Sequence, residues 1–186
     1  MTLDPRDYLL EVLIPAEGLQ ARIAELGREI SAAYAGKAPA LVCILRGGVM
    51  FLCDLVRHMT VPHSMDFMAV SSYGAGARES GGSVRIVMDL VTDIEGRDVL
   101  IVEDIIDTGH TMHYICQVLQ ARNPASLKIC TLLNKAERRE VDVPIDFVGF
   151  DIANKFVFGY GLDLDEYFRN LPFVGVVKPG VFALHP

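Results

Sequence analysis

The stretch Val99–Thr111, which reads VLIVEDIIDTGHT, brings three acidic side chains to the end of an apolar run. Glu103 and Asp104 follow the run directly, and Asp107 opens the segment Asp107–Thr111. In that segment a glycine permits close backbone approach, two threonines offer hydroxyl donors, and the start of a following helix would present free N–H groups. The segment therefore predicts a cradle for an anionic group such as phosphate, and the carboxylates add ligands suited to a divalent cation.

Simpler interpretations of this stretch compete with an anion site. Asp107 and Thr108 could merely cap the following helix, which is the usual role of such residues at this place. Three acids within five residues of an apolar strand end make capping alone less favoured. The commoner phosphate motifs, GxxxxGK followed by Ser or Thr and GxGxxG between strand and helix, are absent from the sequence. Glu103 and Asp104 should point to opposite faces, so they cannot pair on one face unless the strand has already ended.

Hydrophobic periodicity predicts the elements that position this stretch. Helical patterns cover residues 17–34, restart at Leu52, and begin again at Met112. Strands alternate with these helices, which predicts an α/β fold: an open, mostly parallel twisted sheet with helices on both faces. Such sheets bind ligands at the carboxyl ends of their strands. The predicted strands are Ala40–Leu45, Ser64–Tyr73, a return strand around 84–89, Val99–Val102, Leu127–Leu133 and Phe147–Ile152.

The overall composition is that of one folded globular domain. The chain has 186 residues, of which 51% are hydrophobic and 22% charged. Its formal net charge of −7 argues against a general nucleic-acid binder or a membrane-surface protein, both of which need a basic face. The sequence has no apolar run near the ~20 residues that a bilayer requires, and no export signal. The four cysteines form no CxxC pair, which indicates free thiols and a cytoplasmic protein.

The order of residue types in Val99–Thr111 resembles the phosphoribosyl-diphosphate signature of type I phosphoribosyltransferases. That signature runs apolar residues, two acids, two apolar residues, Asp-Thr-Gly, a variable residue and Thr. From about residue 40 to about 177 the chain is similar to the hypoxanthine-guanine phosphoribosyltransferases. The shared motifs are LRGG (45–48), SSYG (71–74), LLNK (132–135), KFVFGYGLD (155–163) and EYFRNLP (166–172). The resemblance implies one phosphoribosyltransferase domain over 1–186, with a core of about 36–150 and a hood from about 1–35 and 151–186.

This resemblance implies a purine-salvage enzyme that uses Mg²⁺. Such an enzyme transfers 5-phosphoribosyl from phosphoribosyl diphosphate to hypoxanthine or guanine and gives IMP or GMP and diphosphate. Its partners are small molecules, and the family forms homodimers and homotetramers. A xanthine-preferring relative is the runner-up. A regulator of the same fold that binds nucleic acid is a further alternative, but 17 basic against 24 acidic residues disfavour it.

Matched positions imply roles for the phosphate and metal contacts. Asp107 matches the general base near purine N7, and the loop around the 5-phosphate matches Asp107, Thr108, Gly109, His110 and Thr111. His110 stands where the family often has lysine, which implies weaker or pH-sensitive phosphate affinity. The implied metal ligands are Glu103, Asp104 and Asp163, with the first two also near the ribose hydroxyls. The implied diphosphate contacts are Arg46, Gly47 and Arg169, with a cis peptide expected at Leu45–Arg46.

The purine contacts implied by the resemblance are Lys135, Phe156, Val157 and Asp163. Lys135 matches the lysine at purine O6, although the charged run KAERRE would by itself suggest a solvated lysine. Phe156 matches the aromatic residue that stacks on the base, and its simpler interpretation is a core residue. Ser72 and Tyr73 match the tip of a closing lid, and the glycine-rich segment after them predicts a mobile loop.

Overall fold

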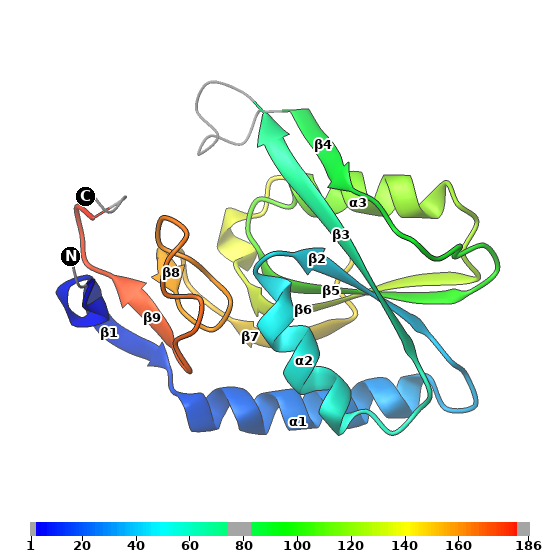
Figure 1. The fold of residues 1–186 in the computed structure, drawn as a ribbon, viewed down its shortest axis with the longest axis horizontal. Coiled ribbons are helices and arrows are strands. Elements are labelled where there is room, and N and C mark those ends of the chain that lie inside the picture. The colour runs from blue at the N-terminus through cyan, green and yellow to red at the C-terminus, as the bar shows by residue number, and fades with distance from the viewer. Residues whose placement is uncertain (1–2, 74–82, 182–186) are drawn as a thin grey trace.

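The computed structural model of the chain, which describes residues 3–73 and 83–181, is built around a six-stranded sheet (Figure 1). The strand order is β4-β3-β2-β5-β6-β7, with β4 antiparallel to β3 at one edge and all other neighbours parallel. The predicted open, mostly parallel sheet is therefore confirmed. Its strands are β2 (Ala40–Leu45), β3 (Ser64–Tyr73), β4 (Ser83–Met88), β5 (Asp98–Ile106), β6 (Ser126–Asn134) and β7 (Phe147–Asp151).

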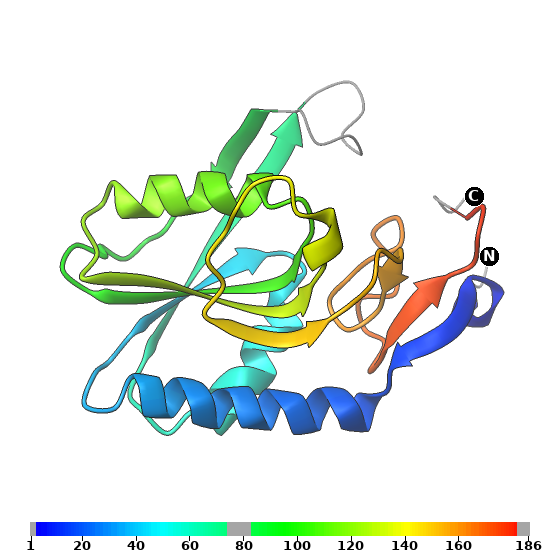
Figure 2. The ribbon, with the colours of Figure 1, turned by 180° about the vertical axis from the view of Figure 1, so that it is seen from behind.

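Helices cover both faces of this sheet, as the sequence predicts. Helices α1 (Ala16–Ala33) and α2 (Gly48–His58) pack against one face, and α3 (His110–Gln120) packs against the other (Figure 1, and from behind in Figure 2). Two short 3-10 turns in the described part of the chain are η1 (Pro5–Asp7) and η2 (Ala136–Arg138). The turn η2 follows β6, which places it at the carboxyl end of a central strand.

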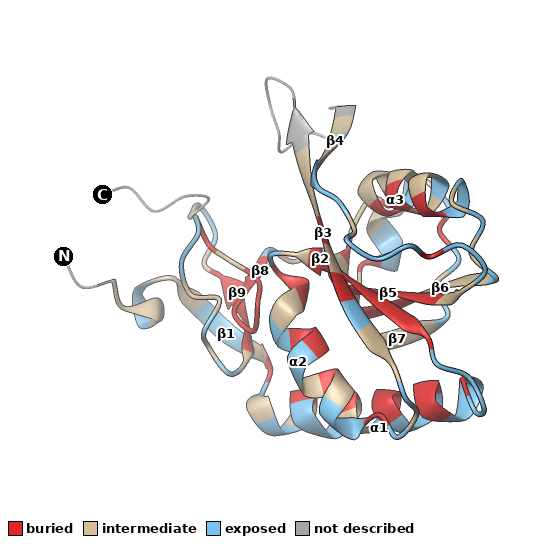
Figure 3. Cartoon of the chain, turned by 45° about the vertical axis from the view of Figure 1, so that its right-hand side comes forward, coloured by how far each residue is buried: buried red, intermediate tan, exposed pale blue. Residues whose placement is uncertain are grey.

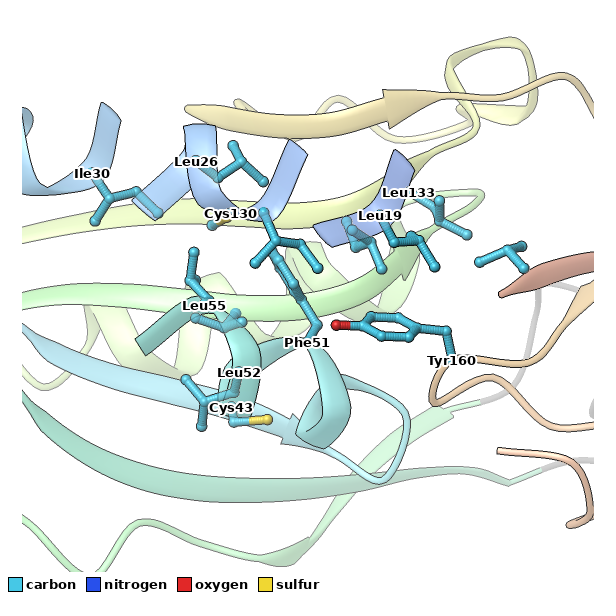
Figure 4. Close-up of a cluster of buried hydrophobic side chains, with 14 of the residues drawn as sticks. Leu19, Leu26, Ile30, Cys43, Phe51, Leu52, Leu55, Cys130, Leu133 and Tyr160 are labelled. Carbon is cyan, nitrogen blue, oxygen red and sulfur yellow. The ribbon is translucent and has the colours of Figure 1, made fainter. Parts of the chain in front are cut away.

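Strand β2 contributes side chains to the hydrophobic cores on both faces of the sheet. Leu41 and Cys43 pack with α1 and α2, whereas Val42 and Ile44 alternate to the α3 side. Figure 3 shows the buried residues continuing along the central strands. Figure 4 shows the cluster on the first face, where Phe51 of α2 lies among side chains from α1 and the sheet. Because helices cover both faces of the sheet, every residue of this strand is apolar and no polar residues alternate with them.

A second, antiparallel sheet joins the two ends of the described chain. Leu9 pairs with Val177 and Ile14 with Val174, and Figure 1 shows the two ends close together. Helix α1 falls within the hood range of 1–35, yet it packs against the large sheet. The boundaries of core and hood stay a prediction. The strand order is β1-β9-β8, with bounds β1 (Leu9–Ile14), β8 (Val157–Phe158) and β9 (Val174–Val177).

The cysteines of the structure are all free. Cys43 and Cys130 are buried, Cys116 is half-buried and Cys53 is exposed. Burial raises the pKa of Cys43 to about 12 and that of Cys116 to about 11. Among the described residues, no helix combines the length and the hydrophobicity needed to cross a bilayer.

A buried carboxylate fastens the segment after β4 to the start of β3. Asp66 accepts hydrogen bonds from the backbone N–H groups of Phe67 at 2.8 Å, Val91 at 3.0 Å and Thr92 at 2.7 Å. Burial alone would raise the pKa of Asp66, but these N–H donors stabilise the anion and hold the pKa below its ordinary value of 3.8. The ionised carboxylate is therefore an anchor for the edge of the sheet.

Replacing that anchor, Asp66→Asn, is expected to lower the free energy of unfolding by about 1–3 kcal/mol at neutral pH. A lowered folded-state pKa gives stability that is present above the ordinary pKa and is lost as the pH falls through the folded pKa. The difference between wild type and variant should therefore shrink below about pH 4. Urea unfolding at several pH values measures it, with Asp142→Asn, an exposed carboxylate, as the control. An equal difference at pH 3 and pH 7 would contradict the assignment.

Candidate active site

A cavity of about 360 Å³ opens at the carboxyl ends of β2 and β5. This is the rim at which a parallel sheet of this kind binds ligands. Residues from four separate parts of the sequence line it: the end of β2 with the segment after it, Val70 of β3, the end of β5 with the start of α3, and the loop after β8. The lining residues include Arg46, Gly47, Glu103, Asp104, Asp107, Thr108, Gly109, Thr111, Asp163 and Arg169.

The two adjacent acids of β5 share this cavity, which corrects the expectation that they would point to opposite faces. Strand β5 does not end before them but runs to Ile106. Its alternation slips by one position at the acids, because Val102 and Ile105, three residues apart, both pack on the α1 and α2 side. Both Glu103 and Asp104 are buried and line the same cavity. An irregularity that the sequence does not show therefore makes them a pair.

Burial and proximity shape the chemistry of this pair. Burial in the strand end, followed by the adjacent Asp104 carboxylate, raises the pKa of Glu103 well above its ordinary value. Gly47 leaves the room that Asp104 fills, since a Cβ on Gly47 would lie 1.6 Å from Asp104 Oδ2. The two adjacent carboxyl groups, buried at the end of β5, would be stabilised in their ionised form by a bound cation.

The segment after β5 forms the loop at the start of α3. Gly109 adopts φ of 92°, a left-handed conformation that favours glycine, and a Cβ there would lie 2.5 Å from Val141 O. Thr108 and Thr111 line the cavity. His110 is not among the lining residues, and its Nε2 lies 2.9 Å from Glu140 Oε2. The side chain of His110 thus faces a carboxylate outside the cavity. The expected effect of His110 on phosphate affinity stays a prediction.

Asp107 lies at the cavity with two cations on its carboxylate. Lys135 Nζ is 3.3 Å from Oδ2, and Arg138 Nε is 2.9 Å from Oδ1. Lys135 is only 6% exposed, so the interpretation of a solvated lysine is wrong. Arg138 is a site residue that the sequence did not indicate, because its run KAERRE is typical of a solvated turn. Arg139 also holds Asp107 in place, because its Nε donates a hydrogen bond to the backbone oxygen of Asp107 at 3.1 Å.

The segment after β2 carries the cis peptide expected at Leu45–Arg46. The loop after β8 packs directly on it, since a Cβ on Gly161 would lie 2.2 Å from Gly47 O. Arg169 from that loop donates to Gly161 O at 2.8 Å and lies 2.8 Å from Asp163 Oδ1. The structure therefore brings the predicted diphosphate contacts of both segments to one wall of the cavity.

The residues implied as purine contacts are spread over more of the structure. Phe156 is 49% exposed, so the interpretation as a core residue is wrong. Val157 is buried in β8 and pairs with Val176. Neither of these two residues lines the cavity, whereas Asp163 does. Lys135 reaches the cavity edge through its contact with Asp107.

Comparison with known proteins fits this geometry. A family model described as a phosphoribosyl transferase domain matches residues 15–165. The chain belongs to the phosphoribosyltransferase family. The expected family is thus confirmed, and the matched range contains the segments that line the cavity, apart from the last part of the loop after β8.

Relatives of this phosphoribosyltransferase have similar length. A hypoxanthine phosphoribosyltransferase of Salmonella typhimurium is 52% identical over 172 residues, covering 91% of this chain and 96% of the relative. A hypoxanthine-guanine phosphoribosyltransferase of Bacillus subtilis is 46% identical and covers 92% and 95%. A crystal structure of a hypoxanthine phosphoribosyltransferase from Staphylococcus aureus matches with a TM-score of 0.92 and 44% identity, covering 99% and 100%. The expected fold is confirmed.

The lid of this phosphoribosyltransferase stays a prediction. Ser72 and Tyr73 end β3, where their backbones pair with Val84 and Ser83 of β4. The side chains of Ser72 and Tyr73, and the glycine-rich segment 74–82, lie outside the described residues. Of the two strands that carry the predicted lid, β3 lies beside β2 and β4 lies beyond β3 at the edge of the sheet, on the side of β2 away from β6.

Proposed function

We propose that this phosphoribosyltransferase acts in purine salvage, transferring 5-phosphoribosyl from phosphoribosyl diphosphate to hypoxanthine or guanine. The observation that carries the proposal is the contact of Asp107 with buried Lys135 at the edge of the phosphate cavity. The pair places a hydrogen-bond acceptor beside a donor. The names of the relatives support the same activity at 46% to 52% identity.

The pair matches one edge of a 6-oxopurine. Guanine presents O6 and N7 side by side, whereas adenine presents an N6 amino donor beside N7. The Lys135 ammonium can donate to O6, and the Asp107 carboxylate can hold a proton at N7 while N9 attacks the sugar. An adenine amino group would face a donor with a donor, so the pair disfavours 6-aminopurines.

The phosphate-binding residues serve mainly to position the sugar and balance charge. Transfer passes through an oxocarbenium-like state, in which catalysis depends on orientation and electrostatic stabilisation. Thr108, Gly109 and Thr111 at the start of α3 suit the 5-phosphate, because helix N-termini present free N–H groups to anions. Arg46 and Arg169 suit the diphosphate, since guanidinium groups match phosphate oxygens.

The acids of β5 fit a magnesium ion that is shared with the substrate. Among the described residues no group of three or more His, Cys, Asp or Glu could hold a metal alone. Mg²⁺ is commonly bound by one or two carboxylates together with substrate phosphates and water. The buried pair Glu103 and Asp104 supplies that number of hard oxygen ligands. When bound, Mg²⁺ would neutralise charge on the diphosphate. Asp163, the third implied ligand, has its Oδ1 2.8 Å from Arg169 Nη2.

We further propose that the protein works in the cytoplasm as a homodimer or homotetramer. The four free thiols support a reducing compartment. The assembly rests on the resemblance to the family. Size-exclusion chromatography with light scattering measures the state directly, and a monomer at working concentration would contradict it.

Initial rates test the function. Phosphoribosyl diphosphate and Mg²⁺ are offered with hypoxanthine, guanine, xanthine, adenine or orotate in parallel, and nucleotide formation is followed by absorbance. We expect turnover with hypoxanthine or guanine, none with orotate, and adenine at background. Preference for xanthine would support the runner-up instead. A gel shift with nucleic acid at physiological salt tests the regulator alternative, for which we expect no shift.

Gly47→Ala tests the cavity wall that carries Arg46, Gly47 and Arg169. We expect it to lower kcat/KM for phosphoribosyl diphosphate at least about tenfold. The new Cβ would sit 1.6 Å from Asp104 Oδ2, so the carboxylate or the loop must move. The measurement is kcat/KM at saturating hypoxanthine. Gly18→Ala is the control, because a Cβ there meets only ordinary contacts of 3.6 Å and beyond. An unchanged kcat/KM in Gly47→Ala would show that the close approach does not matter.

A further inference from the structure

An acidic side chain contacts both arginines that suit the diphosphate, Arg46 and Arg169. Glu166, in the loop after β8, contacts Arg46 through both carboxylate oxygens: Oε2 lies 2.8 Å from Nη1 and Oε1 lies 3.0 Å from Nη2. Its Oε2 also lies 3.6 Å from Arg169 Nη2. The two-point contact on Arg46 is the geometry in which a guanidinium binds a carboxylate or a phosphate. One anion therefore bridges cations from two separate segments of the cavity wall.

The backbone around Glu166 is shaped to hold it there. Glu166 has φ of 73°, and its neighbour Asp165 has φ of 54°, a region that residues with side chains seldom adopt. The Glu166 N–H donates to Asp163 Oδ2 at 2.8 Å. Below the turn, Gly161 lies directly on Gly47. These contacts, together with the hydrogen bond from Arg169 to Gly161 O, hold an unfavourable turn in place so that its carboxylate faces Arg46.

The bridge is also exposed enough to be exchanged. The Arg46 side chain is 68% exposed and that of Glu166 is 56% exposed. Ion pairs at such exposure are weak, because solvent screens them. A doubly or more highly charged phosphate group makes stronger charge-assisted contacts with the same N–H groups. The carboxylate can therefore fill the site between turnovers without blocking it.

We infer that Glu166 is a displaceable internal counter-anion for the diphosphate-binding arginines. Its carboxylate neutralises Arg46 in the empty site and adds a longer contact to Arg169, which also pairs with Asp163 at 2.8 Å. It gives way when the diphosphate binds and returns as diphosphate leaves. Glu166 thus acts as a positioning residue that sets the affinity for substrate and product through the arginines. The inference rests on the proposed function for its ligand, a diphosphate.

Calorimetry with inorganic diphosphate and Mg²⁺ at low salt tests this directly. Removing the competing charge with Glu166→Gln should tighten diphosphate binding about two- to fivefold, in line with the strength of exposed ion pairs. Glu166→Asn is the second variant, because Asn tolerates positive φ better than most residues. The matched control is Asp165→Asn, which removes one exposed negative charge from the same turn; its affinity should stay at the wild-type value.

Kinetics separate this role from a structural one. The KM for phosphoribosyl diphosphate should fall with the diphosphate Kd in both Glu166 variants, while the KM for hypoxanthine stays unchanged. Unchanged or weaker diphosphate binding in the two Glu166 variants would overturn the inference, as would equal tightening in Asp165→Asn. If wild type binds diphosphate in this Glu166-dependent way but does not turn over any purine, the proposed function fails and the inference stands. Absence of diphosphate binding by wild type would overturn both.

Discussion

Asp107→Asn is expected to lower kcat with hypoxanthine by about 10²- to 10⁴-fold, the usual contribution of a general base. The amide keeps the shape of the carboxylate but cannot take the proton held at purine N7. It also replaces the anion shared by Lys135 and Arg138 with a neutral amide, whose oxygen can still accept a hydrogen bond from the buried Lys135. Steady-state rates at saturating substrates measure the loss. Near-normal turnover would refute the assignment of Asp107 as the base.

Two controls separate chemistry from damage in that variant. Binding of phosphoribosyl diphosphate, followed by calorimetry, and the thermal midpoint of unfolding should stay close to wild type. The side chain of Asp107 is 39% exposed, so its replacement removes no core packing. Glu137→Gln removes one negative charge from the exposed part of η2 and should leave kcat unchanged. A large loss in Glu137→Gln would point to a general charge effect instead.

Lys135→Met is expected to lower kcat/KM for hypoxanthine by about 10- to 100-fold, because a charged donor contributes about 1.5–3 kcal/mol to a hydrogen bond. The side chain is buried, and methionine fills a similar volume without a donor. The rate with adenine should not fall, because its amino group no longer meets a donor. The discrimination between hypoxanthine and adenine should therefore narrow by the same factor.

Parallel kcat/KM measurements with hypoxanthine and adenine decide this prediction. Lys155→Met is the matched control, because Lys155 is a half-buried lysine that pairs with Glu11 on the small sheet, outside the cavity. Its discrimination between the two bases should match wild type. If Lys135→Met lowers both rates equally, Lys135 supports the fold of the site but does not read the purine.

The sequence predicted most of the large sheet because its signals are local. Buried parallel strands are short apolar runs, and Ala40–Leu45 is wholly apolar. The phosphate cradle was also visible, since Gly109 and its flanking threonines lie within five residues. The cis peptide at Leu45–Arg46 came from the resemblance to the family, not from any local signal.

The rest of the site depends on contacts between distant segments. Arg138 meets Asp107 across 31 residues, and Arg46 meets Glu166 across 120, so neither pair leaves a pattern in the sequence. The pairing of Glu103 with Asp104 depends on a slip in strand alternation that packing decides. The motif also does not show that His110 Nε2 lies 2.9 Å from Glu140 Oε2, and the phosphate contact of His110 stays a prediction.

The small sheet has a consequence for the order in which the chain can fold. Strand β1 is made first, yet its partner β9 is among the last described residues. During synthesis, β2 to β7 can form the large sheet and its helices while β1 is still an unpaired strand, with Ile14 lacking its partner Val174. Unpaired apolar edges attract other chains. A ribosome-bound chain would therefore carry an aggregation-prone N-terminus until its final segment emerges.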